Sequence, residues 1–310
     1  MTFEDYLLHL FYLVDTQLEA LKLEKGLPRL RSRGPQPVLH DSEVITMELA
    51  GEFRGIDTDE GIYRFFLHYH RREFPGLARV DRTTFARQAA NLWRVKQLLQ
   101  GRLFGLLPAA DEALGGQVLW VFDSFPLRVC RFRRAPGHKL FRGLGAAYGR
   151  DPTDGGREGR FYGFRVHLRT CDRGFCAAFE LAPGNVTDLP LARELAPPGG
   201  GEALGDRNYW GPDAQAALLR DRGLLLLAPF RKKGHDPWPL LSKTLSRLRQ
   251  VIEPVIGQLA NRFHCQSTRA RDLWHLTSRL ARKFLSHTAA VLLNWRQGND
   301  PLKLDLLITE

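Results

Sequence analysis

Three acidic residues set among apolar neighbours are the residues of this 310-residue chain best suited to chemistry. Asp123 and Asp206 each follow a short apolar run, and Glu253 lies within the mostly apolar residues 251–256. A carboxylate is costly to bury unless a charge or hydrogen bonds compensate it, and a metal ion does this well. The three acids together therefore predict one divalent-metal site.

The two aspartates are expected at the ends of strands. Residues 118–122 have strand character and lead into Asp123, and a second strand, at 202–206, ends in Asp206. In open α/β sheets this edge is where ligands bind. An aspartate that merely closes a strand in a turn is the structural alternative for each one alone, and the two converge only if their strands are neighbours.

Glu253 is expected on a helix, one turn after Arg249. An apolar stripe between residues 245 and 259 leaves these two side chains on a neighbouring face. An exposed ion pair between them is the structural alternative, although Arg before Glu is the less favourable order. Because Pro254 disfavours helical geometry at the preceding residue, the helix should kink or restart at Glu253. Such a break either aims the carboxylate or simply joins two helices.

The elements that must position these acids change in character along the chain. Residues 1–107 have apolar spacing typical of helices, with Asp81 as a candidate N-cap. Strands are expected at 118–123, 161–170, 174–182, 202–206 and 224–228, and helices at 187–195, 212–221, 240–264 and 270–295. This order predicts an α/β domain over residues 111–310, a mixed sheet flanked by helices, which follows a helical domain over residues 1–110.

The charge of the chain predicts a polyanionic partner. The net charge is +11, and residues 1–110 hold 15 Lys and Arg against 14 Asp and Glu, whereas residues 111–310 hold 30 against 20. The excess therefore lies in the part that carries the three acids. Residues 124–150 contain no acid and are expected to track the phosphates of such a partner, with a solvated basic loop as the alternative. Their cations are Arg128, Arg131, Arg133, Arg134, Lys139, Arg142 and Arg150.

Composition indicates a globular chain. Hydrophobic residues make up 44% of it, which supports a proper core, and no apolar run reaches 18 residues. The amino-terminal residues carry acids where a signal peptide needs a basic stretch, so a soluble, cytosolic protein is expected. The four cysteines form no CxxC pair and no zinc-ligand spacing, and are expected to be reduced, structural thiols.

The order strand-Asp, strand-Asp, helix-Glu resembles the DDE transposases of bacterial insertion sequences, whose catalytic core is ribonuclease H-like. The resemblance spans about residues 115–295. It is carried by residues 121–127 (VFDSFPL), 162–167 (YGFRVH), 183–188 (PGNVTD) and 205–209 (GDRNY), by Arg249 with Ile252-Glu253, and by 272–279 (DLWHLTSR). It implies that Asp123, Asp206 and Glu253 are the catalytic and metal-binding residues.

The resemblance also implies a mechanism and partners. Two Mg²⁺ or Mn²⁺ ions, about 3.5–4 Å apart, would flank the scissile phosphate. Water would cut at the element end, and the freed 3′-hydroxyl would attack target DNA. The partners would be double-stranded DNA, as terminal inverted repeats and as target, and a second copy of the chain in a homodimer on DNA. A cytoplasmic, nucleoid-associated bacterial protein with no membrane contact would fit.

Two departures from the pattern affect the expected DNA contacts. Many relatives have a Tyr three residues before the Arg and a Lys seven residues after the Glu, where this chain has Ser246 and Ala260. Arg262 is close enough in sequence to replace the Lys. The expected DNA contacts are therefore Arg207, Arg249 and Arg262, in addition to Arg128, Arg131, Arg133, Arg134, Lys139 and Arg142.

Residues 1–110 are expected either to recognise the element ends or to mediate dimerisation. The helix after Asp81 is the best candidate for groove contact, because it carries Arg82, Arg87, Arg94 and Lys96, although a pure packing helix is an equal alternative. Two other functions stay open for the whole chain. One is a ribonuclease H-like nuclease or resolvase that does not join strands, and the other is a non-catalytic DNA-binding protein descended from a transposase.

Overall fold

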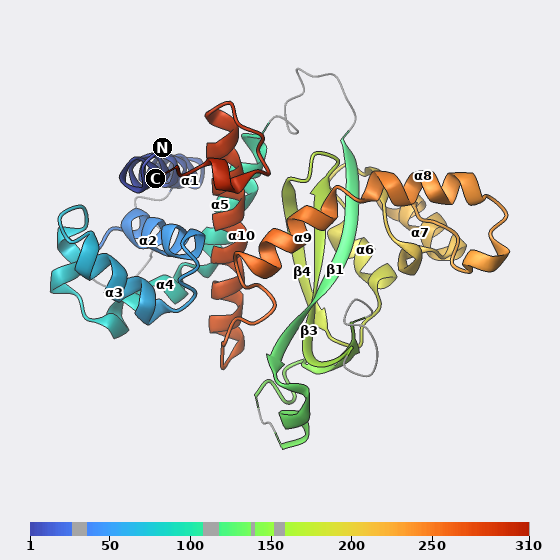
Figure 1. Ribbon diagram of the computed structural model, residues 1–310, viewed down its shortest axis with the longest axis horizontal. Helices are drawn as coiled ribbons and strands as arrows, with labels where there is room; N and C mark the ends of the chain where they lie inside the picture. Colours follow the sequence, from blue (N-terminus) through green and yellow to red (C-terminus); the bar gives the residue numbers. More distant parts are fainter. Residues whose placement is uncertain (27–35, 108–117, 138–139, 152–158, 310) are drawn as a thin grey trace. The chain divides into compact units, whose positions relative to one another are not determined.

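The structure is a computed structural model that describes residues 1–26, 36–107, 118–137, 140–151 and 159–309 (Figure 1). The chain divides into two compact units. Unit 1 contains Met1–Leu106 and Leu259–Glu310, and unit 2 contains Leu107–Gln258. Residues 259–310, expected in the α/β domain, are part of the helical unit.

Unit 1 is built from helices. They are α1 (Phe3–Glu24), α2 (Asp41–Phe53), α3 (Asp59–Tyr69), α4 (Arg82–Asn91), α5 (Trp93–Gly105) and α10 (Leu273–Arg296). The expected N-cap at Asp81 is confirmed, since its carboxylate accepts the backbone N–H groups of Thr83 and Thr84. Helix α10 packs against α5 and α2 and is buried on nearly all sides from Leu276 to Asn294 (Figure 1). This burial explains why the carboxyl-terminal segment belongs to unit 1.

Charged side chains lie inside unit 1 and neutralise one another. The ammonium of Lys96 donates to both carboxylate oxygens of Glu48, at 2.9 and 2.8 Å, and Lys283 donates to Glu52 at 2.6 Å. Arg282 donates to Glu52 at 2.5 Å and to Asp59. Lys96 is fully buried. The expectation that it contacts DNA is therefore wrong, because its charge is used inside the helical core.

Unit 2 is a mixed α/β structure around a six-stranded sheet. The strands are β1 (Leu119–Cys130), β2 (Ala147–Arg150), β3 (Arg160–Cys171), β4 (Cys176–Pro183), β5 (Gly201–Leu204) and β6 (Leu224–Leu227). Strand β1 is antiparallel to β3 and parallel to β5, which is parallel to β6. Strands β2 and β4 both pair with the other edge of β3, at its two ends. The predicted mixed sheet with helices is confirmed.

Helices of unit 2 cover the sheet where its strands are most apolar. Helices α6 (Asp188–Leu195) and α7 (Pro212–Arg222) pack on the face that presents Phe122, Leu224 and Leu226. Helix α8 (Pro239–Arg249) contacts β5, and α9 (Ile252–Asn261) follows it. Because side chains alternate along a strand, the face opposite α6 is available to residues neighbouring Phe122.

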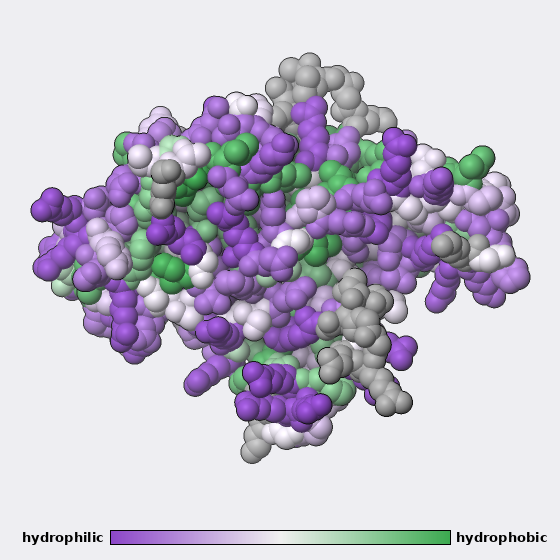
Figure 2. Space-filling view, in the orientation of Figure 1, coloured by the Kyte–Doolittle hydropathy of each residue, from purple (hydrophilic) through white to green (hydrophobic). Residues whose placement is uncertain are grey.

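The surface and the cysteines are as expected for a globular chain with reduced thiols. Hydrophilic side chains dominate the face seen in Figure 2, with apolar ones in smaller patches. All four cysteines are free thiols, and three of them are buried. Across the described residues, no helix has the length and apolarity that a membrane crossing requires.

Candidate active site

Asp123 lies within strand β1 at the point where its pairing with β5 ends. The parallel register runs from Leu119 to Val121 on β1, opposite Glu202 to Leu204 on β5. Strand β1 itself continues to Cys130, paired with β3. The expectation that Asp123 closes a strand is therefore wrong, because β3 supports the backbone beyond the end of β5. Asp123 nevertheless lies two residues beyond the end of the β1–β5 pairing, where that edge of β1 has no partner among the described residues.

Asp206 follows the end of β5 and lies level with Asp123, since each is two residues beyond the last parallel pair. A Cβ at Gly205 would come within 2.5 Å of the Tyr209 ring, so only glycine allows this sharp exit from the strand. Asp206 caps the short helix η5 (Arg207–Tyr209): its Oδ1 accepts the backbone N–H of Asn208 at 2.8 Å, and its Oδ2 accepts the Asn208 side-chain amide at 2.9 Å.

Arg249, at the end of α8, lies between Asp123 and Glu253. Its Nη1 donates to Oδ2 of Asp123 at 2.5 Å, and its Nη2 lies 3.5 Å from Oε1 of Glu253. The side chains of Arg249 and Asp123 are each 19% exposed, and that of Glu253 is 58% exposed. The Arg249–Glu253 pair expected as a structural alternative is present, but Arg249 bonds Asp123 more closely.

The helix break expected at Glu253 is confirmed. Helix α8 ends at Arg249, and α9 begins at Ile252, with Pro254 as its third residue. Proline is tolerated there because the N–H groups of a first helical turn have no partner inside the helix. The backbone N–H of Glu253 donates to the carbonyl of Gln250 at 3.1 Å. The break places Glu253 in the first turn of α9, one turn after Arg249.

The surroundings of the two aspartates favour their neutral forms. Burial raises the pKa of Asp123 to about 6, and the charges of Asp206 and Asp188 add to this, against the opposing effects of Arg249 and the Ser124 N–H. The pKa of Asp206 is also raised, first by burial and then by Asp188, despite the Asn208 N–H and Arg249. Both carboxylates would gain from additional positive charge.

The donor chemistry of the three acids fits a divalent metal ion. Carboxylate oxygens are the ligands that Mg²⁺ prefers, and the raised pKa values of Asp123 and Asp206 show that their charges are incompletely balanced. Among the described residues, however, no three His, Cys, Asp or Glu side chains are grouped closely enough to hold a metal ion as they stand. Arg249 is the cation between Asp123 and Glu253, so an ion held by these two acids would compete with its guanidinium.

A comparison with known families agrees with this arrangement. A family model described as a transposase DDE domain matches residues 116–273, which is more than half of the chain. The chain belongs to the transposase DDE domain family. No curated protein and no solved structure matches it significantly. The match spans all three acids of the site, from Asp123 to Glu253.

In this transposase family member, Asp188 lies beside the site, although its sequence pattern predicted no role for it. Asp188 is the first residue of α6, and its Oδ1 accepts the Ser124 hydroxyl at 2.5 Å. It also lies 3.4 Å from Nδ1 of the buried His167, whose pKa is lowered to about 4, mainly by burial. Arg165 donates to Ser124 at 3.1 Å. An acid at the start of a helix that directly follows a strand was the available signal.

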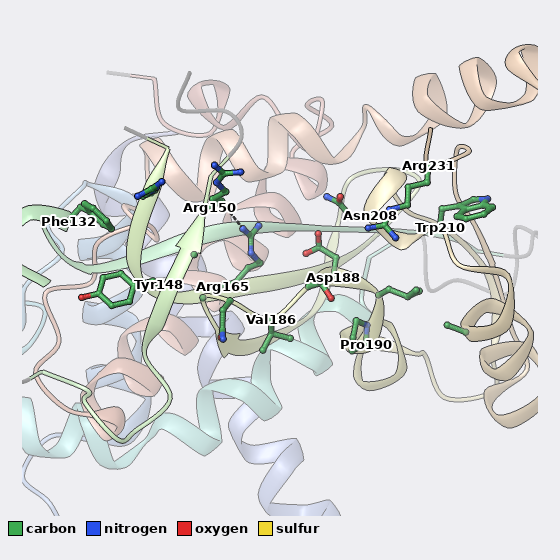
Figure 3. A pocket seen from close by; sticks show the side chains of 17 residues that line it. Phe132, Tyr148, Arg150, Arg165, Val186, Asp188, Pro190, Asn208, Trp210 and Arg231 are labelled. Carbon is green, nitrogen blue, oxygen red and sulfur yellow. Dashed lines mark hydrogen bonds between the residues drawn. The ribbon is translucent and has the colours of Figure 1, made fainter. Parts of the chain in front are cut away.

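Side chains around Asp188 line a cavity of about 930 Å³ on the α6 side of the sheet (Figure 3). Phe122 and Ser124 of β1 face α6, whereas Asp123 faces α8, because successive side chains alternate. The cavity and the Asp123–Arg249 contact therefore lie on opposite faces of β1. Asn208, which bonds Asp206, lines the cavity and lies where the two regions meet.

The cations expected at DNA differ in their surroundings. Exposed ones are Arg131, Arg133, Arg134 and Arg142, the second and third of them in the short helix η4 (Phe132–Gly137). Lys139 lies outside the described residues. Arg128 donates to Asp151 at 2.8 Å, and Arg207 to the carbonyl of Phe230 at 2.5 Å. Arg262 belongs to unit 1, where it donates to Asp305 at 2.7 Å and lies over the Phe53 ring.

Proposed function

We propose that this protein is a transposase that cuts DNA at the ends of its insertion sequence and joins the freed ends to target DNA. The observation that carries the proposal is that Arg249 bonds Asp123 and lies 3.5 Å from Glu253, while Asp206 lies level with Asp123 on the neighbouring strand, all inside the region that matches the transposase DDE domain. Fold adds support. Strand order β4-β3-β1-β5-β6, with the first three antiparallel and the last two parallel to β1, fits a ribonuclease H-like core.

The three carboxylates would hold Mg²⁺ or Mn²⁺, two ions in the full proposal. When bound, such ions activate the attacking oxygen and stabilise the leaving oxygen of a phosphoryl transfer. Asp123 and Asp206 project from the fixed end of the parallel strands, so they would hold their oxygens in place with little motion. Glu253 is the most exposed of the three and lies in the first turn of a helix. This position suits a side chain that coordinates the metal only once DNA is bound.

Arg249 has two roles in this proposal. Without DNA it neutralises Asp123 and Glu253, which would otherwise repel each other. With metal and DNA present, its guanidinium would be released to contact a phosphate, which it binds well through its paired N–H donors. The exposed arginines of residues 131–142 would follow the same backbone, and Arg207 would contact it near Asp206.

Unit 1 would recognise the element ends, and two copies of the chain would act together on them. On α4, Arg87 is exposed with no acidic partner among the described residues, while Arg82 is paired with Glu60 at 3.1 Å. Arg94 at the start of α5 donates to Gln97, and no acidic partner lies beside it in the part of the chain that the structure describes. Light scattering of the protein with and without end DNA would show whether a dimer forms on it.

The deciding experiment incubates the protein with DNA carrying both flanking element ends and Mg²⁺ or Mn²⁺. Cleavage at the ends followed by joining is expected. Asp123→Asn, Asp206→Asn and Glu253→Gln should each slow cleavage on the order of 10⁴-fold while DNA binding is kept. The exposed Asp213→Asn and Glu194→Gln are matched controls that should cleave normally. Substantial cleavage by one of the three variants would refute the role of that residue.

Other outcomes separate the competing functions. Nicking without joining favours a ribonuclease H-like nuclease or resolvase, and binding without cleavage favours a non-catalytic DNA-binding protein.

Metal binding is measured separately, by its effect on stability. At a Mn²⁺ concentration 100 times its dissociation constant, the wild type should gain about 2.7 kcal/mol of stability, whereas Asp123→Asn should gain much less. An equal gain in both would place the metal elsewhere.

A further inference from the structure

The cavity beside Asp188 is a second surface that the three acids do not use. Asp123, Asp206 and Glu253 are absent from its lining, and it lies on the face of β1 opposite the Asp123–Arg249 contact. Its two ends carry aromatic side chains. In Figure 3, Phe132 and Tyr148 lie at one end and Trp210 with Arg231 at the other, with Asp188 between them.

The charge of the cavity favours an anion. Arg150, Arg160 and Arg231 line it, and each is exposed with no carboxylate partner among the described residues. Among the described residues, Asp188 is the one acid of the lining, and its Oδ1 is already bound by the Ser124 hydroxyl. In Figure 3, Arg150 and Arg231 lie apart on the two sides of Asp188, which suits a chain of phosphates better than a single anion.

The aromatic rings are held in place by other rings. Trp210 packs edge-on against Phe230 with ring centroids 4.7 Å apart, and the backbone N–H of Phe230 donates to Ser242 at 3.1 Å. Phe132 and Tyr148 are edge-on at 5.9 Å, and both remain exposed, by 39% and 51%. Positioned rings with open surfaces are platforms on which flat groups can stack.

From these features we propose that the cavity binds a single strand of DNA, with its bases on the rings of Trp210, Tyr148 and Phe132 and its phosphates on Arg150, Arg160 and Arg231. Bases inside a duplex are already stacked on one another, so they cannot reach these rings, whereas unpaired bases can. A volume of about 930 Å³ is of the size that encloses small ligands or a few nucleotides, and is too small for a duplex.

This inference rests on the proposed function, because cleavage at a DNA end is what would supply a separated strand. Asn208 connects the acids with the cavity. Its side-chain amide and backbone N–H donate to Asp206, and the residue also lines the cavity. A strand that leaves the acids would enter the cavity beside Asn208. The cavity would then keep one strand apart while the other is held at the acids.

The test measures binding of the full chain in EDTA, so that no cleavage takes place. The probes are a fluorescein-labelled 12-nucleotide single strand of mixed sequence and the same sequence as a duplex. Trp210→Ala and Tyr148→Ala should each weaken single-strand binding about 5- to 150-fold and leave duplex binding unchanged. Trp238→Ala is the matched control, because Trp238 is 62% exposed in the same unit and does not line the cavity.

Salt dependence tests the arginines. Arg231→Gln should reduce the slope of log affinity against log salt by about 0.7 for the single strand, because one phosphate contact is lost. The exposed Arg222→Gln, on α7 and outside the cavity, should leave the slope unchanged. An equal change in both variants would overturn the assignment of phosphates to this cavity.

The outcomes distinguish this inference from the proposed function. If Trp210→Ala and Tyr148→Ala bind the single strand as Trp238→Ala does, or lose single strand and duplex equally, the cavity is not a single-strand site. If the cavity assignment fails in this way but the wild type still cleaves DNA ends, the proposed function stands. If selective single-strand binding is found without any cleavage in Mg²⁺ or Mn²⁺, the cavity assignment stands and the proposed function fails. Tyr148 is half exposed, so its variant gives a result even if Trp210→Ala does not fold.

Discussion

The molecule has an arginine between carboxylates in each of its two units, and the two arginines differ in how completely their partners are neutralised. In unit 1, Arg282 is 1% exposed and bonds Glu52 and Asp59. Burial alone would raise the pKa of Asp59, but Arg282 and Arg279 outweigh it and hold that pKa at about 2. Each carboxylate there is paired with a cation, and Arg282, Glu48 and Glu52 are almost fully buried.

In unit 2, Arg249 is accessible and its acids are only partly compensated. Asp206 has no cation within ion-pair distance among the described residues, and burial raises the pKa of Asp123 to about 6 despite Arg249. The same residue types therefore stabilise the fold in unit 1 and remain ready for another cation in unit 2. Charge balance, rather than burial alone, separates structural acids from acids suited to chemistry.

The largest expected effect on stability is in unit 1. Arg282→Leu should destabilise the protein by about 3–5 kcal/mol, because it leaves buried carboxylates without their cation. Urea denaturation measures the loss, and hydrogen exchange should place it in α2, α5 and α10. The exposed Arg222→Leu of unit 2 should change stability by less than about 0.5 kcal/mol. A small effect of Arg282→Leu would mean that Lys96 and Lys283 suffice for Glu48 and Glu52.

The contributions of Asp123 and Asp59 to the free energy of unfolding should depend on pH with opposite signs. Asp123 has a folded pKa above its unfolded value of 3.8, so its contribution falls as pH rises from about 4 to 6, by up to about 3 kcal/mol. In metal-free buffer, Asp123→Asn should therefore become more stable than the wild type over this window. Asp59 has a folded pKa near 2, so its contribution of about 2 kcal/mol is complete above pH 4 and is lost as pH falls through 2.

Urea denaturation of the wild type, Asp123→Asn and Asp59→Asn between pH 2 and pH 7 measures both contributions. Asp59→Asn should be the less stable protein at pH 7 and should approach the wild type near pH 2. If both variants differ from the wild type with the same sign at pH 7, the contrast between the two units is wrong.

The smallest effect is expected where an ion pair lies in solvent. Asp305 is 93% exposed and pairs with Arg262, so Asp305→Asn should cost less than about 1 kcal/mol. Arg262→Ala should cost more, because the guanidinium also lies 4.4 Å from the centroid of the Phe53 ring. Thermal denaturation of the two variants compares the ion pair with the ring contact, and equal losses would assign all of the effect to the ion pair.

Local signals predicted much of the local structure around the three acids. Apolar runs ending in acids identified the strands at Asp123 and Asp206, and Pro254 predicted the helix break that sets the place of Glu253. The same signals misplaced Lys96 on a DNA-facing surface and treated Asp123 as the end of its strand. Both errors have one cause: the partner, Glu48 for Lys96 and strand β3 for Asp123, is distant in sequence.

The sequence by itself predicted the order of strands and helices apart from strand β2, the excess of positive charge after residue 110, and the three candidate acids. These follow from spacing and composition, which act over a few residues. Only the tertiary structure decided that Arg249 lies between Asp123 and Glu253, that Asp188 and its cavity occupy the opposite face of β1, and that α10 completes unit 1. Those facts depend on strand register and on contacts between residues more than a hundred positions apart, which no local pattern records.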